Sequence, residues 1–155
     1  MNFAPLIRFI EIMPHDGNHE LVLLKGHLLV EEQLTALIHR AAKRPEFLPA
    51  LRFADKVKLA RANSSSVDAV WLWDALSKMN AARNALSHSL EKSEFDQKLK
   101  SFIDFVEAKK HRPSTEALSD RFGPIHWAIY CVHCTLSVEA TFEFSKLKVE
   151  TLLAG

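Results

Sequence analysis

The stretch that says most about the fold is HELVLLKGHLLVEEQLTALIHRAA, residues 19–42. Its apolar side chains recur at helical spacing in two rows, one of Leu21, Leu24 and Leu28 and one of Leu23, Val30, Leu34 and Leu37. A helix with so broad an apolar face is suited to the interior of a helical bundle, where several neighbours cover it.

Segments of helical length and period continue along the chain between breaks rich in Pro, Gly, Ser and Asn. The pattern predicts helices over residues 47–62, from Ser65 or Ser66 to Leu90, after a capping Ser93, and over residues 125–153. The last segment is rich in β-branched residues, but its apolar positions recur at helical spacing and no partner strand is evident. We therefore predict an all-α fold, an up-and-down bundle of five to six helices in one domain spanning residues 1–155.

Composition limits the class of protein. The chain has 155 residues, of which 48% are hydrophobic and 25% charged, and its formal net charge is +1. These values are typical of one globular domain and argue against a general polyanion binder. The N-terminus lacks the pattern of a signal peptide, and no apolar run approaches the ~20 residues of a membrane span. We expect a cytoplasmic protein without a membrane partner.

The charge is concentrated in one region. Residues 40–61 contain seven basic and two acidic side chains, a net charge of +5, so the remainder of the chain sums to −4. Such a basic stretch suits contact with an RNA backbone. The candidate backbone-binding residues are Arg52, Lys56, Lys58 and Arg61. The alternative is a solvated face of an amphipathic helix, which is common in soluble proteins.

A charged residue interrupts the apolar row of the helix that follows the serine-rich break. Arg83 lies between Met79 and Leu86 in a row that includes Leu90. A guanidinium stays charged at working pH, so we expect it to meet a carboxylate, a bound phosphate or a partner subunit. His88 follows five residues later, roughly 140° around the helix from Arg83. Spacing alone therefore does not bring the two side chains together.

The segment Arg83-Asn84-Ala85-Leu86-Ser87-His88 resembles the signature of the HEPN (higher eukaryotes and prokaryotes nucleotide-binding) family, in which Arg and a polar residue precede His by a short spacer. Residues 24–31 and 53–60 are also similar to bacterial proteins of this kind. The resemblance implies a helical homodimer whose two motifs line one cleft. It also implies a metal-independent endoribonuclease of a toxin or defence system, with Arg83, Asn84 and His88 as catalytic residues and a cognate antitoxin or neighbouring-gene protein as a possible partner.

The residues themselves suit this chemistry. RNA supplies its own nucleophile, the 2′-hydroxyl, so an enzyme needs proton transfer and charge stabilisation but no cofactor or metal. His88 can act as base or acid, Arg83 can hold phosphate oxygens at two points, and Asn84 can orient the phosphate or the imidazole. The products would be a 2′,3′-cyclic phosphate and a 5′-hydroxyl. The alternative is a non-catalytic HEPN-like bundle that binds a partner protein or a nucleotide.

Glu31 and the two cysteines are weaker candidates for site residues. Glu31 could pair with Arg83 or orient His88 across the bundle, although an exposed acid on a helix face is the simpler interpretation. Cys131 and Cys134 are the only cysteines, and with His133 between them and His126 before them they have the ligand types of a zinc site. No second cysteine pair exists, so we interpret them as buried helical thiols.

Overall fold

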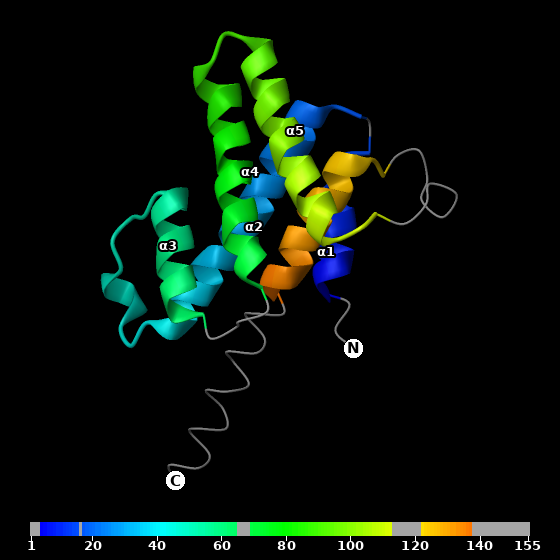
Figure 1. Cartoon of the computed structure of the whole chain (residues 1–155). Helices are drawn as coiled ribbons and strands as arrows, with labels where there is room; N and C mark the ends of the chain where they lie inside the picture. Colours follow the sequence, from blue (N-terminus) through cyan, green and yellow to red (C-terminus); the bar gives the residue numbers. More distant parts are fainter. Residues whose placement is uncertain (1–3, 16, 65–68, 113–121, 138–155) are drawn as a thin grey trace.

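The structure, a computed structural model, describes residues 4–15, 17–64, 69–112 and 122–137, and all regular structure in these ranges is helical (Figure 1). The elements in chain order are α1 (Ala4–Ile12), α2 (His19–Ala41), a short 3-10 helix η1 (Pro45–Phe47), α3 (Phe53–Asn63), α4 (Val70–His88) and α5 (Lys92–Lys109). Residues 124–137 form a further helical segment. The predicted all-α helical bundle is confirmed.

The other helices pack around α2 and α4. Helices α4 and α5 run side by side as a hairpin and share the most extensive contact between elements, while α3 packs against α2 and α4 (Figure 1). The helical segment 124–137 lies beside α1 (Figure 1). Helix α2 begins at His19 because the side chain of Asn18 accepts a hydrogen bond from the Leu21 backbone N–H, which would otherwise lack a partner at the helix start.

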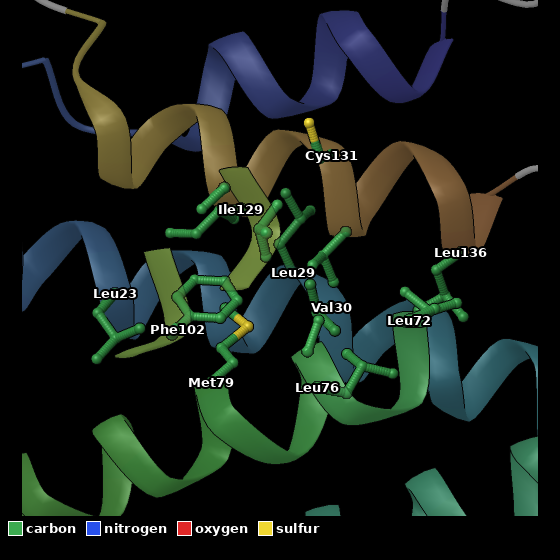
Figure 2. Close-up of a cluster of buried hydrophobic side chains, with 14 of the residues drawn as sticks. Leu23, Leu29, Val30, Leu72, Leu76, Met79, Phe102, Ile129, Cys131 and Leu136 are labelled. Atoms are coloured by element: carbon green, nitrogen blue, oxygen red, sulfur yellow. The ribbon is translucent and has the colours of Figure 1, made fainter. Parts of the chain in front are cut away.

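The core consists of apolar side chains from α1 to α5 and from residues 124–137, part of which Figure 2 shows. Its fully enclosed members include Leu23, Val30 and Leu34 from α2, Leu72, Leu76 and Met79 from α4, Phe102 from α5, and Ile129 and Leu136 from segment 124–137. Gly26 lets α2 approach that last segment closely, because a Cβ at this position would lie 2.7 Å from two side-chain atoms of Ile129. A glycine is therefore required by packing rather than by backbone conformation.

The predicted boundary of the second helix was wrong. Residues 45–47 form only one 3-10 turn, and α3 begins at Phe53 rather than Phe47. The physical reason is Pro49, which has no backbone N–H and disfavours helical geometry at the residue before it. The chain therefore stays irregular from Leu48 to Arg52.

Other boundaries also differ from the sequence prediction. Helix α4 ends at His88, so Leu90 is fully exposed beyond the helix instead of extending its apolar row. Ser93 lies inside α5, whose N-cap is Glu91, so Ser93 is not the cap. The proposed start at Ser65 or Ser66, and residues 138–153 of the last predicted helix, lie outside the described residues. Helix α1 was not predicted at all.

None of the helices in the described part of the chain combines the length and apolar composition needed to cross a membrane.

Candidate functional site

The candidate site is a cleft of about 520 Å³ between α2, the start of α3 and the second half of α4. Its lining residues are His27 and Glu31 from α2, Arg52, Phe53 and Ala54 around the start of α3, and Asn80, Arg83, Asn84 and His88 from α4. The structure thus brings together the three residues of the HEPN-like motif, the candidate carboxylate and one of the four candidate backbone-binding residues.

Helix geometry explains how Arg83 and His88 reach the same cleft. At ~100° per residue, Asn80 and Asn84 lie ~40° apart, with Arg83 on one side of them and His88 on the other. The cleft therefore covers an arc of roughly 140° on α4, with the two asparagines in its middle. One protomer supplies both side chains, without a helix distortion or a second copy of the motif.

Arg83 is half-buried at the edge of the core, not within it as the apolar row predicted. After Met79, the buried face of α4 continues through Ala82 and Ala85. These small side chains let α4 pack closely and leave Arg83 beside the core, facing the cleft. Within the described part of the chain Arg83 forms no ion pair, and neither does Arg52.

The charges at the cleft are only partly balanced. Glu31 accepts a hydrogen bond from Lys56 at 2.8 Å, and these side chains are only 30% and 17% exposed, so each largely neutralises the other. Glu31 therefore pairs with Lys56. It does not form the pair with Arg83 or His88 that the sequence had left open. The remaining charges are the guanidinium groups of Arg52 and Arg83, which give the cleft a net positive potential suited to an anion.

His27 is a buried residue of this cleft. Burial lowers its pKa, because the charged imidazolium would lose its solvation; nearby Arg83 and Lys56 act in the same direction, whereas Asn80 and Glu31 oppose the shift. Its ring packs against Phe53, with the ring centroids 4.0 Å apart. The ring nitrogen Nε2 lies 3.3 Å from Oδ1 of Asn80.

The sequence motifs did not indicate His27 or Asn80 as site residues, although His27 lies one helical turn before the candidate Glu31. A signal for Asn80 was present, because it lies four residues before Asn84 and so shares a helix face with it. No sequence signal linked that face to α2, because the contact depends on how the helices pack.

The basic stretch 40–61 is divided by the fold. Lys58 and Arg61 line a neighbouring hollow of about 320 Å³, which shares Phe53, Ala54 and Asn80 with the cleft. Lys58 also lies 3.6 Å from Asp55 in an exposed pair, and Arg44 pairs with Glu46 at 3.1 Å. The predicted backbone-binding residues thus fall into two adjoining hollows, apart from Lys56, which pairs with Glu31.

The cysteines lie outside the cleft. Cys131 is buried, and burial raises the pKa of its thiol to about 12. His126 uses Nε2 to bond the Pro14 carbonyl oxygen at 2.7 Å, so that nitrogen holds the loop after α1. Among the residues that the structure describes, no three His, Cys, Asp or Glu side chains are grouped as a metal site would require.

Comparison of the chain with protein-family models, with curated proteins and with solved structures gave no match. The HEPN resemblance consequently rests on the motif of residues 83–88 and on the two similar segments, residues 24–31 and 53–60.

Proposed function

We propose that this chain is a metal-independent endoribonuclease whose site is the cleft between α2, α3 and α4. The observation that supports this most is the grouping of two guanidinium groups, Arg52 and Arg83, with the exposed imidazole of His88 around one cleft; neither guanidinium forms an ion pair with another described residue. Guanidinium groups bind phosphate oxygens through charge-assisted hydrogen bonds, and RNA presents a phosphate beside its own 2′-hydroxyl nucleophile. The proposed site therefore needs only positioning, charge stabilisation and proton transfer.

Each motif residue has a distinct role in this proposal. Arg83 binds two oxygens of the scissile phosphate and stabilises the additional negative charge of the transition state. His88 transfers a proton, since histidine is the side chain whose charge changes near neutral pH. Asn84, between them on α4, orients the phosphate. Arg52 contacts an adjacent phosphate from the start of α3, and the products are a 2′,3′-cyclic phosphate and a 5′-hydroxyl.

A non-catalytic function as a nucleotide-binding bundle is favoured by one observation. His88 receives no hydrogen bond from any side chain in the described residues, whereas catalytic histidines are usually oriented by a second group. The same two arginines would then bind the phosphate of a nucleotide without cleaving it. An RNA cleavage assay distinguishes the two functions.

We further propose a homodimer and a toxin or defence role with an antitoxin or neighbouring-gene partner, as the family resemblance implies. Uncontrolled RNA cleavage harms a cell, so such an enzyme requires restraint by a partner. Because one protomer already unites Arg83 and His88, the dimer is not needed to assemble these two side chains. Light scattering at micromolar concentration should give twice the monomer mass, and a stable monomer would contradict the proposed dimer.

The decisive experiment is RNA cleavage by the purified protein in the presence of a chelator. We expect wild type to cleave, and His88→Ala to lose ~10²–10⁴ in rate while its thermal melt is unchanged, because the side chain is exposed and lies at a helix end. Arg83→Lys should also fail, because an ammonium group cannot bind two phosphate oxygens in the planar geometry of a guanidinium. The matched control is His39→Ala, an exposed histidine of α2 outside the cleft. Failure of wild type to cleave any RNA, with retained nucleotide binding, would favour the non-catalytic function.

A further inference from the structure

His27 is a second histidine of the cleft, and it has no role in the function proposed above. Cleavage of RNA through its 2′-hydroxyl needs two proton transfers, one from the attacking hydroxyl and one to the leaving 5′-oxygen. The cleft contains one histidine on α2 and one at the end of α4, and their environments differ. His27 is 5% exposed, whereas His88 is exposed to solvent.

The hydrogen bond to Asn80 defines which nitrogen of His27 is available. Oδ1 of Asn80 is an acceptor, so the bond at 3.3 Å requires the proton to be on Nε2. The other nitrogen, Nδ1, then has a lone pair. Among the described residues, the buried side-chain atoms that lack a hydrogen-bond partner include Nδ1 of His133 but no atom of His27. Within the described ranges Asn80 is the one hydrogen-bond partner of the His27 ring, so Nδ1, which is not among these unpartnered buried atoms, keeps some exposed surface.

The charge state of His27 suits a proton acceptor. Burial, and to a lesser extent the positive charges of Arg83 and Lys56, lower its pKa, so the ring is neutral at physiological pH. The charged groups that face it are Glu31 of the same helix, Lys56 of α3 and Arg83 of α4. Packing against Phe53 holds the ring plane in place. A neutral imidazole with a fixed tautomer is ready to accept a proton.

We propose that His27 is the general base of this site and that His88 is the general acid. Nδ1 of His27 takes the proton of the 2′-hydroxyl, and the 2′-oxygen forms a bond to phosphorus. The bond from phosphorus to the 5′-oxygen breaks, and that oxygen takes a proton from the His88 imidazolium. One histidine gains the proton that the other loses, so exchange with solvent restores both. This inference rests on the proposed ribonuclease function.

The first test is the rate of RNA cleavage as a function of pH in His27→Gln, with His39→Gln as the matched control on the same helix. We expect the rate at neutral pH to fall ~10²–10⁴-fold in His27→Gln and the rise of the rate on the acidic side of the wild-type profile to disappear. His39→Gln should reproduce the wild-type profile. A wild-type profile in a folded His27→Gln protein would overturn the inference.

The second test separates the two proton transfers with an RNA whose scissile 5′-oxygen is replaced by sulfur. A thiolate leaves without protonation, so this substrate no longer needs the acid. We expect the substrate to restore most of the activity lost in His88→Ala but none of that lost in His27→Gln. Restoration in His27→Gln, or equal defects in both variants, would overturn the assignment.

The third test keeps the inference testable if the buried substitution prevents folding. Nitrogen NMR of histidine-labelled wild type should show His27 protonated at Nε2 and unprotonated at Nδ1, and its signals should shift when a non-cleavable 2′-deoxy oligonucleotide binds. A proton on Nδ1, or signals that ignore the oligonucleotide, would overturn it. If wild type cleaves RNA in a His88-dependent manner and these tests fail, only the role of His27 is lost; if wild type cleaves no RNA, the proposed function itself fails.

Discussion

Replacing Gly26 with Ala tests how tightly α2 packs against residues 124–137. The added Cβ would lie 2.7 Å from both Cδ1 and Cγ2 of Ile129 and 3.2 Å from its Cγ1. Rotation about the outer bond of Ile129 could move Cδ1 but not Cγ2, and in a helix the β-branched side chain has one preferred rotamer. Helix α2 and segment 124–137 would therefore have to separate.

The two energetic effects of this substitution have opposite signs. Alanine stabilises a helix interior by ~1 kcal/mol relative to glycine, whereas overpacking a core costs typically ~1–3 kcal/mol. Two contacts with one fully buried side chain favour the upper part of that range. We expect Gly26→Ala to lower the free energy of unfolding by about 1–2 kcal/mol, as measured by urea denaturation.

Two further variants complete the test. Gly123→Ala is the matched control, because a Cβ there meets no atom within 4 Å, and its stability should be equal to or slightly above that of wild type. In a double-mutant cycle, Ile129→Ala should cost less in the Gly26→Ala background than alone, since it removes all three close atoms. A Gly26→Ala protein that is more stable than wild type would refute the reasoning, because helix propensity would then be the only effect.

Three other predictions follow from the charges and titratable groups. Burial lowers the pKa of His133 below its usual 6.5, so the unfolded state binds more protons as the pH falls; the melting temperature should be constant above about pH 7 and drop below pH 6.5, with a weaker dependence in His133→Gln. Because the pKa of Cys131 is about 12, the thiol should react with a thiol reagent at pH 8 only slowly until the protein is unfolded, and fast labelling of the folded protein would contradict its burial. Charge reversal of Arg52 and Lys58 should weaken RNA binding and reduce the slope of log K against log salt concentration by ~1.4 for single-stranded RNA. The control Lys98→Glu, on α5, should leave this slope unchanged, and equal slopes in all variants would exclude the basic stretch from RNA binding.

The long helices could be predicted because their apolar periodicity is strong and uninterrupted. Helix α2 follows the pattern of residues 19–42 to within one residue of its end. The errors arise where local chemistry outweighs periodicity. Pro49 delays α3 until Phe53, and α4 stops at His88 although Leu90 continues the apolar spacing. An apolar row alone contains no information about where the backbone turns away.

The candidate site was predictable in its α4 residues but not in its arrangement. Arg83, Asn84 and His88 were chosen from a local motif, and all three line the cleft. These three side chains spread over a wide arc of α4, and they share one cleft only because other elements pack over that arc. Those elements are α2, through His27, and the start of α3, near Arg52. Such contacts between distant segments follow from how the helices pack, which motifs and periodicity within single helices do not reveal.

The Glu31–Lys56 pair shows why charge counting along a sequence misjudges a site. The sequence predicts an RNA-backbone contact for Lys56 and leaves Glu31 either an exposed acid or a partner of the motif residues, but the fold places the two side chains 2.8 Å apart in a half-buried pair. A lone Glu31 at this position would compete with phosphate for Arg83. Because Lys56 holds the carboxylate, Arg83 and Arg52 keep their charge for a ligand, so the main effect of this basic residue is to neutralise an acid at the wall of the cleft. Lys56→Met should therefore weaken anion binding, because it leaves the Glu31 carboxylate without its partner, and the double variant Lys56→Met/Glu31→Gln should restore binding. A phosphate or oligonucleotide titration that finds the single and double variants equal would contradict this role.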